Sequence, residues 1–128
     1  MIYIVLNALP IAAATAGGLL FGYIYAALMR MRGVSPAIFV TVALAEFWLA
    51  AILAGALILA PPKQGLWTMA LGSAFVIWIG FVVPVIVTSY RFRRLAVRAA
   101  LMDSMHWLGV MLIQATILRL IGLTPPPA

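Results

Sequence analysis

Four long apolar segments, separated by short stretches rich in arginine, proline and glycine, account for almost the whole chain. They cover residues 8–29, 36–60, 66–90 and 95–121. A helix needs about 20 mainly apolar residues to cross the hydrocarbon core of a membrane, and each segment is longer than that. The pattern predicts an all-α fold: an integral membrane four-helix bundle that forms one transmembrane domain over residues 1–128.

Local signals mark where these helices begin and end. Ser35-Pro36 suits the N-cap and first helical position of the second helix, and Asn7 is a plausible cap for the first. Pro84 lies inside the third segment, where it removes a backbone hydrogen bond and is expected to kink or loosen the helix. Gly122 suits the position just after the last helix.

Composition supports the membrane interpretation. The chain is 67% hydrophobic, whereas soluble domains are about 45–50% apolar. Its net charge of +6 comes from eight basic and two acidic residues. Because the basic residues lie in short loops and not along a helix face, we expect the lipid bilayer as a partner and no nucleic acid. The absence of cysteine excludes disulfides and thiolate metal sites.

The distribution of basic residues predicts the orientation. Two of the loops share one side of the membrane, and the residues at that side are Arg30, Arg32, Arg91, Arg93, Arg94 and Arg98. Only Lys63 and Arg119 lie toward the other side. Positive residues favour the cytoplasm, so we expect a multi-pass protein of the bacterial inner membrane with both termini in the periplasm.

The two halves of the chain are weakly similar. Each contains a glycine-rich helix, a basic loop and a helix in which one acidic residue precedes Trp-Leu, at residues 43–49 and 100–108. Aligning them requires a two-residue gap. Two interpretations stay open: a parallel repeat of two helical hairpins, or chance similarity between apolar sequences.

The second half also resembles a known family. Residues 74–84 (AFVIWIGFVVP), followed by Thr88-Ser89-Tyr90, are similar to the third helix of the bacterial family catalogued as domain of unknown function 1761. Residues 101–108 resemble the last helix of that family, and residues 18–25 resemble its glycine-then-aromatic pattern. This chain has Ser89 where the family usually has Asn. The resemblance implies a small four-helix bacterial membrane protein and no particular activity.

Three ionisable side chains are expected at membrane depth, where they are energetically costly. Glu46 should lie about 15 Å from the basic side and Asp103 about 12 Å, with His106 one turn deeper. At 100° per residue, Trp107 and Gln114 share the helix face of Asp103 and His106. This face should point into the bundle.

Tryptophan usually lies in the interfacial belts of a membrane. Counting along each helix instead places Trp48, Trp78 and Trp107 near the midplane, at the depth of Glu46 and His106. The complete candidate polar site consists of Glu46, Asp103, His106, Gln114, Trp48, Trp78 and Trp107.

Two interpretations of this site stay open. The carboxyl groups could be neutral and hydrogen-bonded, holding the bundle together. Alternatively, a carboxyl–histidine set ringed by tryptophan could bind a cation or relay a proton. Neither a metal site nor a cofactor is expected, because only Glu46, Asp103 and His106 could serve as metal ligands and the chain has no cofactor-binding motif.

Gly18, Gly22 and Gly55 lie at small-xxx-small spacings that permit close contact between helices. That contact could be internal or with a partner. Since no catalytic motif is present, enzymatic activity is not expected. The first functional hypothesis is an accessory or assembly subunit of a larger membrane complex. The alternative is a small proton- or cation-coupled transporter that acts as a homo-oligomer through Glu46, Asp103 and His106.

Overall fold

The computed structural model describes residues 1–31 and 33–127, and over these residues the chain forms helices and turns without strands. The elements are α1 (Ile2–Leu6), α2 (Ala8–Leu28), α3 (Pro36–Leu59), the 3₁₀ helix η1 (Pro62–Gln64), α4 (Leu66–Ile77), the π-helical η2 (Trp78–Val82), α5 (Val83–Phe92) and α6 (Val97–Ile121). Helices α4, η2 and α5 form one continuous rod. The described residues thus contain four helices long and apolar enough to cross a membrane, which confirms the predicted all-α class.

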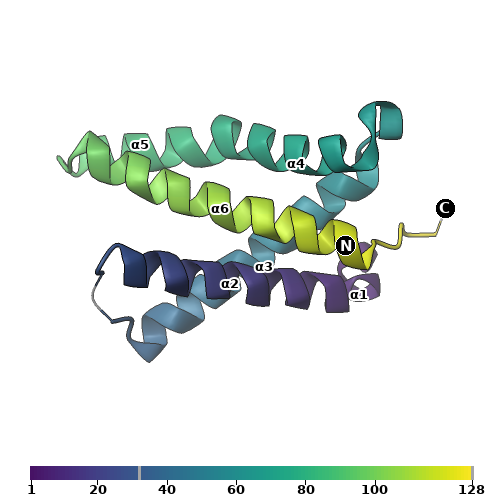
Figure 1. The fold of residues 1–128 in the computed structure, drawn as a ribbon, viewed down its shortest axis with the longest axis horizontal. Coiled ribbons are helices and arrows are strands. Elements are labelled where there is room, and N and C mark those ends of the chain that lie inside the picture. The colour runs from purple at the N-terminus through teal and green to yellow at the C-terminus, as the bar shows by residue number, and fades with distance from the viewer. Residues whose placement is uncertain (32, 128) are drawn as a thin grey trace.

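Helix α6 lies between α2 and the rod formed by α4, η2 and α5, and it packs against both (Figure 1). Helix α3 crosses obliquely over this layer. It contacts α2 and α6 and reaches α4 near its own C-terminus. The α2–α3 and α5–α6 connections lie at one end of the bundle, here called the basic end. Both termini and η1 lie at the opposite end.

Both connections at the basic end open with the same backbone motif. Arg30 and Arg94 adopt left-handed φ values of 54° and 58°, a conformation that usually favours glycine. After each arginine, the next amide reaches back to a carbonyl five residues earlier, from Met31 to Ala26 and from Leu95 to Tyr90. This is the Schellman ending of a helix, here with arginine at the left-handed position.

The start of α3 follows the sequence prediction. Ser35 is its N-cap, and its hydroxyl accepts a hydrogen bond from the amide of Ile38 at 3.3 Å. Pro36 occupies the first turn, where its missing amide hydrogen costs nothing. Helix α6 begins at Val97, two residues after the start expected at about Leu95, because Leu95 completes the Schellman turn and Ala96 is extended.

Pro84 loosens the third span, as its position predicts. The turn just before it, Trp78–Val82, is π-helical, and the amide of Val83 bonds to the carbonyl of Trp78 five residues back. Proline cannot donate the usual hydrogen bond to a carbonyl four residues earlier, so the chain accommodates it with a wider turn. The rod continues through this point without a break (Figure 1).

Asn7 has a different role from the predicted one. It separates α1 from α2, but its side chain makes no capping hydrogen bond. Its amide nitrogen donates to the carbonyls of Tyr3 and Thr124, both at 2.8 Å, and its amide oxygen accepts from the Thr124 backbone at 2.7 Å. Asn7 thus occupies the predicted N-cap position of α2 without capping it through its side chain, and this buried side chain instead joins the N-terminal turn to the segment after α6.

The helices meet through small residues. Buried alanines from several helices form much of the core: Ala14, Ala50, Ala51, Ala54, Ala70, Ala74, Ala100 and Ala115. Small side chains let helix backbones approach closely, as is usual in membrane bundles. Most large apolar side chains instead cover the outer surface, an arrangement that suits lipid better than water.

Candidate functional site

Glu46 lies in the middle of α3, where this helix crosses α2 and α6, and none of its surface is exposed. Neither of its carboxyl oxygens has a hydrogen-bond partner among the described residues. A buried polar group normally finds a partner, since leaving it unpaired costs about 1–3 kcal/mol and more for a charge. This carboxyl group is therefore the chief exception in the bundle and the centre of the candidate site.

Gly18 and Gly22 of α2 make room for this carboxyl group. A Cβ atom added to Gly18 would collide with Oε2 of Glu46. One added to Gly22 would stand 3.8 Å from Oε1 of Glu46 and 3.1 Å from Nε2 of His106. The small-residue spacing found in the sequence thus faces the polar residues of α3 and α6. Gly55 lies elsewhere, against the ring of Tyr3.

Gln114 of α6 is fully buried and faces α3 near Glu46, but its side chain does not bond to the Glu46 carboxyl group. Its amide nitrogen donates to the backbone carbonyl of Glu46 at 3.1 Å. The side-chain oxygen of Gln114 has no partner within the described part of the chain. Gln114 thus fixes the α3–α6 crossing and leaves the Glu46 carboxyl group unpaired.

His106 stands in an aromatic environment. Its ring centre lies 5.3 Å from that of Tyr25, 6.2 Å from that of Phe21 and 5.2 Å from that of Trp107. The Tyr25 hydroxyl donates to the carbonyl of Met102 at 2.8 Å, which anchors α2 to α6 beside the histidine. Nε2 of the His106 imidazole faces Gly22, which also lies beside Oε1 of Glu46.

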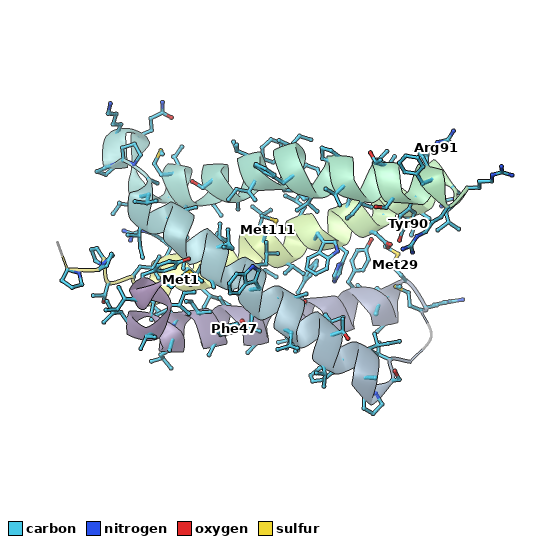
Figure 2. The ribbon with its side chains drawn as sticks, turned by 180° about the vertical axis from the view of Figure 1, so that it is seen from behind. Met1, Met29, Phe47, Tyr90, Arg91 and Met111 are labelled. Atoms are coloured by element: carbon cyan, nitrogen blue, oxygen red, sulfur yellow. The ribbon has the colours of Figure 1, made fainter. Side chains whose placement is uncertain are left out.

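Asp103 lies one turn nearer the basic end. It accepts a hydrogen bond from the hydroxyl of Tyr90, which comes from the last turn of α5. Tyr90 and Met29, at the end of α2, lie at the same end of the bundle (Figure 2). Tyr90 is not among the site residues predicted from the sequence. Its position across the α5–α6 hairpin from Asp103 is the signal that could have identified it.

A cavity of about 370 Å³ opens beside these groups. It lies between α2, the N-terminal half of α3 and α6, and Met31 and Val34 of the α2–α3 connection border it. Its lining includes Glu46, Asp103, His106 and Trp107, with apolar and aromatic residues around them. The structure thus brings three of the predicted ionisable residues and one predicted tryptophan to a single cavity.

The other two candidate tryptophans lie apart from this cavity. Trp78 is buried against α6 and donates from Nε1 to the carbonyl of Ser104 at 2.6 Å. Trp48 has 53% of its surface exposed, on the outer side of α3. Depth along a helix was the basis of the predicted tryptophan layer. Depth does not determine which way a side chain points, so Trp48 shares the level of Glu46 without joining it.

No family model, curated protein or solved structure matches the chain. The resemblance of residues 74–90 and 101–108 to domain of unknown function 1761 therefore stays a prediction.

Proposed function

We propose that this chain is a small multi-pass transporter of the bacterial inner membrane that exchanges a cation for a proton at Glu46. The observation that carries the proposal is the Glu46 carboxyl group. It is fully buried, has no partner among the residues described, and lines a cavity large enough for a small molecule. Ligand sites are typically cavities of this kind, mostly apolar with a few polar groups.

Electrostatics explains why two ligands should compete for Glu46. An ionised carboxylate inside a membrane is strongly disfavoured unless a positive charge accompanies it. The group is therefore expected to carry a proton when the cavity is empty and to be ionised when a cation lies beside it. Each cation that enters then releases one proton.

The other titratable groups facing the cavity offer a route for that proton. Tyr23 and Tyr25 line it from α2, and Asp103 and His106 line it from α6. Helix α5 contributes Tyr90, bonded to Asp103. In this proposal Asp103 exchanges protons near the basic end and His106 passes them to Glu46. Chains of carboxyl and imidazole groups serve this purpose in many membrane proteins.

Orientation and internal symmetry form part of the same proposal. The basic end faces the cytoplasm and both termini face the periplasm, in accordance with the distribution of positive residues. The matching Schellman turns at Arg30 and Arg94 support a parallel repeat of two helical hairpins. A homo-oligomer would allow the cavity to open toward each side of the membrane in turn, which a single bundle of this size does not allow by itself.

An accessory subunit of a larger complex is the second candidate. It is favoured by the N-terminal half of α3, where Ile38, Phe39 and Val40 are each more than half exposed. A membrane partner would cover this surface. Recovery of a larger complex in fixed ratio after mild solubilisation would support this candidate, and recovery of a homo-oligomer alone would count against it.

Proton exchange in vesicles tests the transporter proposal. Vesicles loaded with a pH-sensitive dye and containing the protein receive sodium, guanidinium or tetraphenylphosphonium on the outside, with protein-free vesicles as the baseline. At least one cation should raise the internal pH with the wild type and none should with Glu46→Gln. Thr41→Val is the matched control on α3, because the exposed Thr41 hydroxyl donates to the carbonyl of Ala37 in its own helix and Thr41 is not among the residues that line the cavity. An equal response from wild type and Glu46→Gln would refute the proposal.

A further inference from the structure

The chemistry of the cavity points to a particular class of cation. Beyond Glu46, Asp103 and His106, its lining consists of aliphatic and aromatic side chains and the small residues Gly22 and Ala26. Tyr23, Tyr25, Phe39 and Trp107 are the aromatic members. Aromatic faces attract positive charge, and the attraction strengthens where water is excluded.

The surroundings of Glu46 suit a bare metal ion poorly. Calcium takes six to eight oxygen ligands, and magnesium needs a near-ideal octahedron. Glu46 offers two oxygens, and the space at Gly18 that its Oε2 occupies is otherwise bordered by a methyl group of Val110 and the amide nitrogen of Gln114, neither of which is an oxygen ligand. Within residues 1–31 and 33–127, no group of three His, Cys, Asp or Glu side chains could hold a metal ion. One carboxylate can nevertheless balance one large organic cation whose charge is spread over its own atoms.

We propose that the cavity binds an organic monovalent cation with an apolar or aromatic body, whose positive centre lies at Glu46 and whose body packs against Tyr25, Phe39 and Trp107. This inference rests on the proposed function and specifies its substrate class. The unpaired, fully buried carboxyl group selects for the positive charge. The aromatic lining of the roughly 370 Å³ cavity selects for the body.

The mouth of the cavity indicates how such a ligand enters. Met31 and Val34 of the α2–α3 connection line the cavity and are each 57% exposed. Ile38 and Phe39 line it from the first turns of α3 and are similarly exposed. The exposed lining therefore extends from the α2–α3 connection along the flank between α2 and α3, which offers a sideways route from the lipid as well as one from the basic end. The arginines at the basic end repel a cation in water, so entry from the lipid is favoured.

Binding of two ions of equal shape and opposite charge tests the substrate class. Tetraphenylphosphonium and tetraphenylborate are titrated calorimetrically into the full chain in detergent, with empty micelles as the blank. The wild type should bind tetraphenylphosphonium at least about tenfold more tightly than tetraphenylborate, as expected for a cation beside a desolvated carboxylate. Glu46→Gln should remove the preference, and Glu46→Asp should keep part of it. Equal affinities for the two ions in the wild type would overturn the proposal without any variant.

A matched pair of substitutions on α3 tests the entry route. Ile38 and Val40 are both 55% exposed, but only Ile38 lines the cavity. Ile38→Trp should slow the association of tetraphenylphosphonium by about tenfold or more, because a larger side chain fills the mouth, and Val40→Trp should leave the association rate unchanged. Equal rates in both variants would exclude the sideways route.

The outcomes also separate this inference from the proposed function. If sodium or guanidinium drives proton exchange through Glu46 while tetraphenylphosphonium neither binds selectively nor drives exchange, the substrate class is wrong and the exchange function stands. If tetraphenylphosphonium binds selectively through Glu46 but no cation drives exchange, the exchange function is wrong and the ligand class stands.

Discussion

Gly18 of α2 leaves the space that the carboxyl group of Glu46 on α3 occupies. A Cβ atom at position 18 would collide with Oε2 of Glu46 and would also stand 3.1 Å from Val110 and 3.2 Å from the amide nitrogen of Gln114. The carboxyl group thus lies at a point where three helices meet and where the smallest residue is required. A small-xxx-small spacing, which usually serves helix packing, here makes room for a polar side chain.

Alanine at this position should perturb both the bundle and the site. Gly18→Ala is expected to lower the free energy of unfolding by about 1–3 kcal/mol, because added volume in a packed core forces its neighbours to shift. The measurement is loss of helical circular dichroism in detergent micelles as sodium dodecyl sulfate is added. Gly72→Ala provides the control, since no described side chain beyond its chain neighbours lies within 4 Å of a Cβ atom there. It should leave stability unchanged or raise it by up to about 1 kcal/mol. Equal stability of the two variants would show that the α2–α3 approach is looser than described.

Asn7 should hold the segment after α6 in place. Asn7→Leu removes both hydrogen bonds to Thr124, whereas Asn7→Asp keeps an acceptor for the Thr124 amide. A typical hydrogen bond contributes about 0.5–1.5 kcal/mol, so exchange of the Thr124 amide hydrogen should accelerate up to about tenfold in Asn7→Leu. In Asn7→Asp it should change little. Hydrogen–deuterium exchange followed by nuclear magnetic resonance measures both. Unchanged exchange in Asn7→Leu would contradict this role.

The orientation can be mapped with single cysteines, because the chain has none of its own. Gln64→Cys, in η1, should react with a membrane-impermeant maleimide added to the periplasmic side of intact cells. Gly33→Cys, at the basic end, should react only after the cells are opened. Apart from its chain neighbours, no described residue lies within 4 Å of a Cβ atom at Gly33, so the described structure leaves room for this substitution. The reverse labelling pattern would place the arginine-rich loops outside.

Much of the fold could be predicted because its signals are local. The apolar lengths give the four long helices, Ser35 and Pro36 mark the start of α3, and Pro84 explains the π-helical turn. The contact between Asn7 and Thr124 could not be predicted, because the two residues are 117 positions apart and either polar side chain could equally have faced water. The start of α6 lies two residues later than expected because the Schellman turn extends through an arginine in a conformation typical of glycine.

The candidate site, too, could be predicted only in part from the sequence. Helical periodicity correctly groups Asp103, His106 and Trp107 on one face of α6, and all three line the cavity. Trp48 shares the depth of Glu46 but points outward, because the direction of a side chain depends on how α3 is rotated in the bundle. That rotation is set by packing with α2 and α6, which is not encoded locally.

The most direct test of the account follows the protonation of Glu46 itself. The chain has only two acidic side chains, so its infrared spectrum contains few carboxyl signals. Difference spectra are recorded on addition of sodium, guanidinium or tetraphenylphosphonium to wild-type protein and to Glu46→Gln. If Glu46 exchanges a proton for a cation, at least one cation should convert a protonated carboxyl band into carboxylate bands in the wild type, and this change should be absent in Glu46→Gln. Identical difference spectra for the two proteins would contradict this exchange.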